Sequence, residues 1–414
     1  MADSNAHYDA LETRAPATRE REQMAALAKL VAHARKNSPY FRRLLAKVKP
    51  AEIVSRAALA QLPVTRKSDL TATQQQDKPF GGLNAAPLTK VKHVFMSPGP
   101  LYEPEGYEKD ASRFGRALWA AGGRPGDIIH NTYSYHLTPA GMLMESAAHA
   151  IGCPVFPAGI GNTELQLLAI ADIGPTFYAG TPSFLRILLD KGRELGFDTS
   201  SLKRGLVGGE ALPPSLRREL SERGVDVLQA YGTADLGLIA YESPAKEGMI
   251  CDEGVIVEIV EPGGSRPVGE GETGEVVVTT FNKVYPLVRF ATGDLSAVLA
   301  GQSPCGRSNM RLRGWLGRAD QSTKVKGMFV HPGNVAEVAR RHAEIKKVRL
   351  VVGSQDNVDQ MTLRCEVDGG NEGLRNAIAG SLQTVLKLRG AVEFVAPGTL
   401  PNDGKLIEDA RSYK

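Results

Sequence analysis

Two segments of the sequence carry residue types that suit a bound nucleotide. Val207-Gly-Gly-Glu-Ala211 follows an expected strand, and its two glycines let a flat ligand approach the backbone closely. Gln229-Ala-Tyr-Gly-Thr-Ala-Asp-Leu-Gly237 also follows an expected strand and offers Tyr231, Thr233 and Asp235 within five residues. An aromatic face, a small donor and an acid suit a nucleotide with its Mg²⁺. Either segment alone is more often a strand–helix turn with a capping acid.

Three downstream segments favour a single nucleotide site over ordinary strand–helix turns. Phe290-Ala-Thr-Gly-Asp294 places an acid after an expected tight glycine turn, which suits ribose hydroxyls, and Gly317-Arg-Ala-Asp320 follows it. Leu400-Pro-Asn-Asp-Gly-Lys405 is a loop with a glycine-backed lysine near the C-terminus. On its own, Lys405 is better explained as a solvated surface lysine.

The elements that must position these residues follow three successive patterns of secondary structure along the chain. Residues 91–229 alternate short apolar strands with helical segments, which predicts a mostly parallel sheet covered on both faces. Ligands of such sheets bind at the carboxyl ends of the strands. After residue 250, strands expected at Val255–Val260, Gly274–Thr280 and Leu287–Arg289 predict a small antiparallel barrel or sheet. From Lys324 onward the pattern predicts a compact α+β unit of about 95 residues, with a hinge near Gly317–Gln321.

Composition indicates an ordinary globular chain and excludes several classes of protein. The 414 residues are 42% apolar, and 50 basic against 46 acidic side chains give a net charge of +4, which makes no case for nucleic acid or anionic membrane as a partner. Four cysteines do not form a disulfide framework. The polar start lacks the apolar core of a signal peptide, and no apolar run reaches the length of a membrane span. We therefore expect a soluble, cytoplasmic protein without a membrane partner.

Taken in order, these segments resemble the signature series of adenylate-forming acyl-CoA ligases, most nearly the phenylacetate–CoA ligase branch. Tyr40-Phe-Arg-Arg-Leu44, Gly161-Asn-Thr-Glu164 and Pro286-Leu-Val-Arg-Phe-Ala-Thr-Gly-Asp294 extend the resemblance over most of the chain. It implies an α/β fold with a large AMP-binding domain over residues 1–319, in which about 250–317 form a β-rich subdomain. A small mobile α+β lid domain would follow over residues 320–414.

The resemblance also implies a role for each matching residue. Tyr231 would stack on the adenine, Thr233 would contact the α-phosphate, and Asp294 would bind the ribose hydroxyls. Asp235 stands where the family usually has Glu and would be a Mg²⁺ ligand. Lys405 would bridge the acid's carboxylate and the α-phosphate as a catalytic residue beside Thr233. The other implied positions are Gly208, Gly209 and Glu210 along the adenine, Ser97, Gly99 and Gly232 at the nucleotide, Arg318 at ribose or phosphate, Asp320 as the hinge, and Lys326 and Gly327 in the wall of a coenzyme A tunnel.

The acid substrate is expected at Asn131-Thr-Tyr-Ser-Tyr-His136, whose counterpart in the branch lines the aryl pocket. An aromatic slot with small-residue gaps would be formed by Tyr133, Tyr135, His136, Ala158, Gly159 and Ala230. The alternative is that the two tyrosines pack in the core.

One segment departs from the family pattern. The phosphate loop, normally Ser/Thr/Gly-rich and ending in lysine, is here Ser97-Pro-Gly-Pro-Leu-Tyr-Glu-Pro-Glu-Gly106. Each proline removes a backbone N–H that could hold phosphate, and Glu103 and Glu105 bring negative charge toward a polyanion. Either the loop is rebuilt to orient the acid or a metal, or ATP binding is weakened.

Some relatives carry a Cys/His zinc site near a Cys-Gly-Arg segment, and this chain has Cys305-Gly-Arg307 and Cys251. A tetrahedral site needs four ligands, and Ser243 and Ser303 occupy the companion positions. Two free thiols are therefore expected rather than structural zinc.

These observations predict an ATP- and Mg²⁺-dependent ligase that converts an aromatic, phenylacetate-like acid to its coenzyme A thioester through an acyl-adenylate. Two alternatives stay open: a catalytically weakened homologue that binds nucleotide or acyl-adenylate, and an adenylating enzyme that loads a carrier-protein thiol. The resemblance also implies a homodimer.

Overall fold

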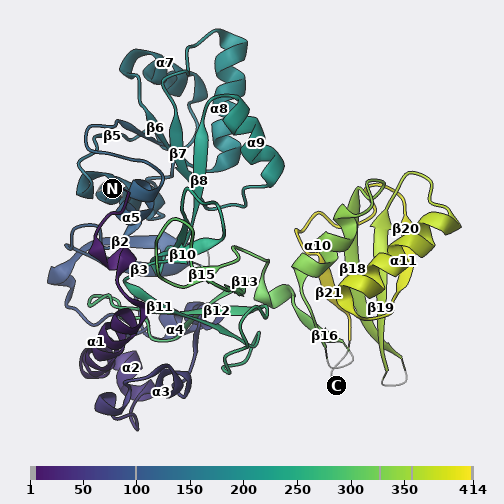
Figure 1. The fold of residues 1–414 in the computed structure, drawn as a ribbon. Coiled ribbons are helices and arrows are strands. Elements are labelled where there is room, and N and C mark those ends of the chain that lie inside the picture. The colour runs from purple at the N-terminus through teal and green to yellow at the C-terminus, as the bar shows by residue number, and fades with distance from the viewer. Residues whose placement is uncertain (1–5, 98–99, 326–327, 356–357, 412–414) are drawn as a thin grey trace.

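The computed structural model describes residues 6–97, 100–325, 328–355 and 358–411. Its largest element is a nine-stranded sheet in the order β14-β15-β10-β9-β8-β7-β6-β4-β5 (Figure 1). The strands are β4 (Ile129–Asn131), β5 (Val155–Phe156), β6 (Phe177–Gly180), β7 (Arg204–Val207), β8 (Asp226–Thr233), β9 (Gly237–Glu242), β10 (Met249–Cys251), β14 (Val298–Leu299) and β15 (Arg311–Leu312). β4 to β8 pair in parallel, as predicted, whereas β9, β10, β14 and β15 pair antiparallel.

Alternate residues of the parallel strands feed two separate cores, one on each face of this sheet. Leu206 and Leu228 join a core with α5 (Phe114–Ala120) and α6 (Ala140–Ala150). Val207 and Val227, their neighbours in sequence, join the core of the other helices, α7 (Thr163–Ile173), α8 (Pro182–Leu195) and α9 (Pro214–Glu222). The period of two along a strand produces this division and confirms the predicted two-faced cover.

A second sheet, in the order β1-β13-β12-β11, packs with the N-terminal helices. Its strands are β1 (Thr65–Arg66), β11 (Val255–Val260), β12 (Gly274–Thr280) and β13 (Phe290–Ser296). The helices are α1 (Pro16–Asn37), α2 (Pro39–Leu44), α3 (Arg56–Ala60) and α4 (Leu70–Gln76), with single 3₁₀ turns at Ala10–Thr13, Pro50–Glu52, Lys67–Asp69 and Leu88–Lys90. α1 and α2 are separate helices because Ser38 caps α2 and Pro39 begins it.

Three expectations for local structure were wrong. Leu287–Arg289 is not a strand, and Phe290-Ala-Thr-Gly-Asp294 is not a tight turn, because these residues form β13, which pairs with β12 with a register shift. The expected open loop after Val91–Met96 is the second half of a hairpin, in which β2 (Val91–Ser97) pairs with β3 (Leu101–Gly106).

The C-terminal unit has a four-stranded sheet in the order β20-β19-β18-β21. Its elements are β16 (Thr323–Val325), β17 (Met328–Val330), α10 (Pro332–Arg340), β18 (Lys347–Gln355), β19 (Val358–Glu366), α11 (Glu372–Leu386), β20 (Ala391–Val395) and β21 (Ile407–Asp409). Its core draws only on residues from Val325 to Ile407, and the chain enters it through a 3₁₀ turn at Ala319–Gln321. Figure 1 shows this unit in yellow-green beside the rest of the molecule.

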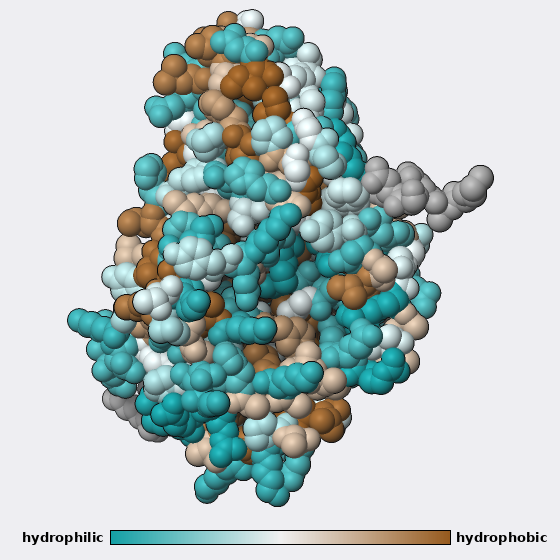
Figure 2. Space-filling model, turned by 90° about the vertical axis from the view of Figure 1, so that its left-hand side faces the viewer, coloured by the Kyte–Doolittle hydropathy of each residue, from teal (hydrophilic) through white to brown (hydrophobic). Residues whose placement is uncertain are grey.

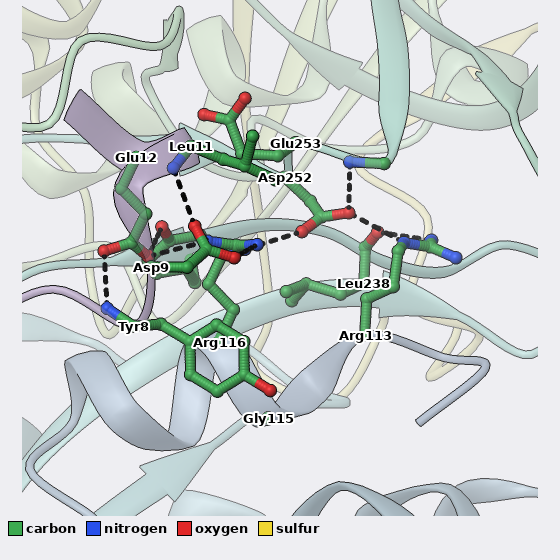
Figure 3. Close-up of polar contacts among 12 residues, drawn as sticks. Tyr8, Asp9, Leu11, Glu12, Arg113, Gly115, Arg116, Leu238, Asp252 and Glu253 are labelled. Carbon is green, nitrogen blue, oxygen red and sulfur yellow. Dashed lines mark hydrogen bonds and ion pairs between the residues drawn. The ribbon is translucent and has the colours of Figure 1, made fainter. Parts of the chain in front are cut away.

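Ion pairs fasten the N-terminal segment and the start of α5 to the large sheet (Figure 3). Arg116 donates to both carboxylate oxygens of Asp9 at 2.9 and 2.8 Å, and Arg113 donates to Asp252 at 2.7 Å. Arg113 also donates to the carbonyls of Leu236 and Leu238, at 2.6 and 3.0 Å. It thereby holds the turn between β8 and β9. None of the helices in the described part of the chain has the length and apolarity needed to cross a bilayer.

Candidate active site

The carboxyl ends of β7 and β8 bring the two glycine-containing segments together. β7 ends at Val207, which pairs with Gln229 of β8, so Gly208 and Gly209 follow directly beside Ala230. β8 continues to Thr233, further than expected, because its second half pairs with β9. An ideal Cβ at Gly208 would lie 2.8 Å from the Ala230 carbonyl oxygen, so only glycine fits this close approach.

A polar cleft of about 890 Å³ lies at this edge of the sheet. Among its lining residues are four predicted nucleotide-binding residues, Gly209, Thr233, Asp294 and Arg318. Arg66 and Lys67 also line it and were not predicted. They reach the cleft because β1 pairs in parallel with β13, with Arg66 opposite Ala291.

Asp294 is the centre of a hydrogen-bond network in the cleft. Its carboxylate accepts from the Tyr231 hydroxyl at 2.9 Å, from Trp315 Nε1 at 3.0 Å and from Arg318 at 3.1 Å. Burial and the neighbouring Asp294 charge raise the pKa of Tyr231 well above its usual value. Tyr231 therefore stays a neutral donor, and the network brings together three residues that are distant in sequence.

A mostly apolar cavity of about 190 Å³ adjoins the cleft. Seven of the predicted site residues line it: Ser97, Tyr133, Gly208, Gly209, Ala230, Gly232 and Thr233. Sequence reasoning missed the contributions of α5 and α6, namely Phe114, Ala140, Leu143 and Met144. The Tyr133 hydroxyl bonds the Gly208 backbone, and burial raises the pKa of Tyr133, so this side chain packs as a neutral wall.

The cavity and the cleft share two lining residues, Gly209 and Thr233. A molecule in the apolar cavity and a molecule in the polar cleft would therefore meet at these residues. The Thr233 hydroxyl oxygen lies at the junction and accepts from the Leu236 N–H at 3.2 Å.

Other residues predicted for the site line neither the cavity nor the cleft. The Tyr135 hydroxyl donates to Glu145 of α6 at 2.9 Å, and Tyr135 lines a separate surface cavity. His136 is exposed, and Gly159 donates its N–H to the Asn131 carbonyl beside Ala158. Glu210 is exposed and accepts from the Ser183 N–H at the start of α8.

The predicted lid residues are not assembled at the cleft. Lys405 is exposed on the loop before β21, and its N–H donates to Asp403 at 3.1 Å. Asp320 belongs to the 3₁₀ turn at the expected hinge, and its side chain is outside the described part of the structure. Gly99, Lys326 and Gly327 also fall outside the described residues. Their roles stay predictions.

Asp235, the predicted magnesium ligand, does not line the cleft. Its Oδ2 accepts from Lys67 Nζ at 2.5 Å, and the side chain lines a small inner cavity with Glu103. Burial and the nearby Asp235 raise the pKa of Glu103 to about 8. As placed, the donor set does not fit a cleft-bound magnesium ion.

The four cysteines of the chain are free thiols. Cys251 is buried, which raises its pKa to about 12. Cys305 Sγ lies 3.0 Å from the Ser303 hydroxyl, and hydrogen bonds with Ser243 and Ser303 outweigh burial and lower the pKa of this thiol. Within the described ranges, no three His, Cys, Asp or Glu side chains are grouped to hold a metal ion.

Arg66, Lys67 and Glu103 are among the polar residues that sequence reasoning did not assign to the site. The sequence contained a signal for each of them. Both basic residues stand in Leu62-Pro-Val-Thr-Arg-Lys-Ser-Asp-Leu70, and Glu103 stands in the segment that departs from the family pattern.

Comparison with known proteins identifies relatives along most of the chain. The profile of the family described as AMP-binding enzyme matches residues 118–282. The phenylacetate–coenzyme A ligase of Thermus thermophilus is 32% identical over 359 residues, which are 82% of this chain and 80% of that protein. The Pseudomonas putida protein of the same name is 30% identical over 424 residues, covering 96% and 95%.

The fold is that of adenylate-forming enzymes. An open conformation of 2-hydroxyisobutyryl-CoA ligase, solved with 2-HIB-AMP and CoA, superposes with a TM-score of 0.88 at 24% identity. The match covers 99% of this chain and 95% of that one, so the C-terminal unit is included.

Proposed function

The chain belongs to the phenylacetate–CoA ligase branch of adenylate-forming enzymes, and from this premise we propose that it joins an aromatic carboxylic acid to coenzyme A at the expense of ATP. One observation carries the proposal: the apolar cavity and the polar cleft meet at Gly209 and Thr233. An acid bound in the cavity would present its carboxylate there to the α-phosphate of ATP.

In the first half-reaction, a carboxylate oxygen attacks the α-phosphorus and pyrophosphate leaves, which gives the acyl-adenylate. Negative charge accumulates during this step, and fixed cations that face it supply catalysis. Arg66, Lys67 and Arg318 line the cleft and are the cations in place. Lys405 is proposed to join them when the C-terminal unit turns toward the cleft. Magnesium is proposed to enter as the counterion of ATP.

In the second half-reaction, the thiol of coenzyme A attacks the acyl carbonyl carbon. The bond to AMP breaks, AMP leaves, and the thiol proton passes to solvent. Lys326 and Gly327 remain the residues proposed for the wall of the thiol tunnel.

The cavity supports an aromatic acid as the substrate. No charged side chain is among its lining residues, and Phe114 and Tyr133 contribute aromatic rings. A volume of about 190 Å³ leaves room for a substituted phenyl ring but provides no partner for a second charged group. Phenylacetate-like acids fit this description, and the reaction would activate them for catabolism.

The test is acid-dependent release of pyrophosphate by purified protein supplied with ATP, Mg²⁺ and a panel of neutral aryl acids. We expect release with at least one phenylacetate-like acid and formation of its coenzyme A thioester. Absence of acid-dependent pyrophosphate across the panel would refute the proposal.

A second candidate is a homologue that binds nucleotide without efficient turnover. The observation that favours it is the acidic β2–β3 hairpin, which replaces the family's phosphate loop. Calorimetry with ATP distinguishes the two: tight ATP binding without pyrophosphate release would support the second candidate.

We propose that the enzyme acts as a homodimer in the cytoplasm, where ATP and coenzyme A are available. α7 supports the dimer, since Leu165, Leu168 and Ile173 on this helix are exposed. In Figure 2, hydrophobic side chains gather at the top of the molecule, at the height of α7 and α8 in Figure 1. Light scattering coupled to size exclusion would measure the oligomeric state.

A further inference from the structure

A small inner cavity lies beside the junction of cavity and cleft. It is lined by Glu103 of β3, Asp235 of the β8–β9 turn and Tyr285, and it shares Ala234 with the larger apolar cavity. Its volume is about 30 Å³. Since one water needs roughly 10–15 Å³ on this measure, the space suits one small ion and a single water molecule.

Two carboxylate oxygens of the residues that line this cavity have no hydrogen-bond partner among the described residues. Glu103 is 3% exposed, its Oε1 accepts from the Ser97 hydroxyl, and its Oε2 makes no hydrogen bond. The Asp235 side chain is fully buried, its Oδ2 accepts from Lys67, and its Oδ1 makes no hydrogen bond. Buried polar atoms are almost always satisfied, so two orphan oxygens that line one cavity point to a group that binds both.

The charges of the cluster specify that group. When both carboxyl groups are ionised, Glu103 and Asp235 contribute two negative charges, and Lys67 contributes one positive charge. Glu105 also lines the cavity, but its carboxylate is already engaged by His93 at 2.7 Å. One further positive charge would neutralise the cluster, and buried charges need such compensation.

We propose that this inner cavity binds an alkali-metal cation, K⁺ or Na⁺, through Glu103 Oε2 and Asp235 Oδ1. Oxygen donors are the ligands that hard cations prefer. A divalent ion would leave the cluster with an excess positive charge. Tyr285 lines the same cavity, and its buried hydroxyl also makes no hydrogen bond to the described residues.

The cation would stabilise the wall of the nucleotide cleft. It would hold Asp235 in place beside Lys67, with which Asp235 is paired, and Lys67 lines the cleft. The site thus lies outside the acid and nucleotide sites, yet is connected to the latter through one ion pair.

The test measures thermal unfolding of the full, substrate-free chain at constant ionic strength. KCl or NaCl replaces tetramethylammonium chloride, whose cation is too large for the cavity. We expect a saturable rise of about 3 °C in the unfolding midpoint with at least one of the two salts. The two arms identify the preferred ion, and because no substrate is present, the result is independent of the proposed ligase activity.

Two variants on β3 distinguish a specific cation site from a general effect of salt on the charges of the protein. Glu103→Gln keeps the shape of the side chain but removes the charge, and the salt-dependent rise should be lost. Glu105→Gln is the matched control, since that carboxylate is held by His93, and the rise should persist. A rise retained in Glu103→Gln, or lost in both variants, would overturn the proposal.

A direct measurement keeps the proposal testable even where Glu103→Gln fails to fold. Thallium(I) replaces K⁺ and scatters anomalously, so a crystal of the unmodified protein grown with thallium acetate should show an anomalous peak between Glu103 and Asp235. The proposal is overturned if the crystal shows no anomalous peak in this cavity, or if neither salt gives a saturable shift. The two carboxylates would then share a proton instead of binding a cation.

Discussion

Asp294→Ala is expected to weaken ATP binding about 100-fold. The Asp294 carboxylate faces the cleft and accepts from Tyr231, Trp315 and Arg318, so it is held in one orientation. In its predicted role it accepts hydrogen bonds from the ribose hydroxyls. Hydrogen bonds to a charged group contribute about 1.5–3 kcal/mol each. Two such bonds at the lower end give about 3 kcal/mol, and each 1.4 kcal/mol is tenfold in affinity.

The assay is calorimetric titration of ATP without acid, together with the KM for ATP in pyrophosphate release. Trp315→Phe is the graded control, because it removes one donor to Asp294 and leaves the carboxylate in place. A single orienting bond of about 1 kcal/mol predicts an effect of about fivefold. If Asp294→Ala is folded and binds ATP within threefold of the unmodified protein, the assignment of Asp294 to the ribose is refuted.

Three further outcomes are expected. Lys405→Ala should abolish adenylation but retain most thioester formation from preformed acyl-AMP, and equal loss of both steps would contradict the role assigned to this lysine. Gly208→Ala should raise the KM for the acid at least tenfold with little change in the KM for ATP, because the new Cβ would lie 2.8 Å from the Ala230 carbonyl oxygen. Separate saturation curves for the acid and for ATP measure both values. Arg116→Ala should lower the free energy of unfolding by about 1.5–3 kcal/mol, because it removes the two charge-assisted hydrogen bonds to Asp9, while Glu12 and Asp252 keep Arg307 and Arg113 as partners. Although burial opposes the shift, the Arg116 contacts lower the pKa of Asp9, so the stability from this pair is present at neutral pH and lost as the pH falls below about 4; acid titration of unfolding should show this loss in the unmodified protein and not in the variant.

The fold was predictable where one local pattern decides it. Strand β11 was placed correctly at both ends, because an apolar run bounded by turn residues requires no long-range information. The end of β8 was not, since its last residues pair with β9, with Tyr231 opposite Ala240. No residue within β8 signals that antiparallel partner, so the expected loop is instead a strand edge that carries Tyr231 and Thr233.

The acid pocket shows the same limit at the level of single side chains. Tyr133 and Tyr135 stand two residues apart in one polar segment, and the sequence does not indicate which of them lines the pocket. The structure separates them through their partners: the Tyr133 hydroxyl bonds the Gly208 backbone, and the Tyr135 hydroxyl donates to Glu145. The choice depends on how α6 packs against the sheet, and that packing also brings Leu143 and Met144 into the cavity.

The departure from the family's phosphate loop has a different meaning in three dimensions from the one its composition suggests. Glu103 and Glu105 would oppose ATP if they faced the cleft, but neither lines it. Glu105 is paired with His93, and Glu103 is buried against Ser97 in the wall between the cavities. Because β1 pairs with β13, Arg66 and Lys67 supply positive charge to the cleft from a distant part of the sequence. The hairpin therefore lacks the loop lysine without adding negative charge to the cleft, so its acidic residues give no reason to expect weakened ATP binding.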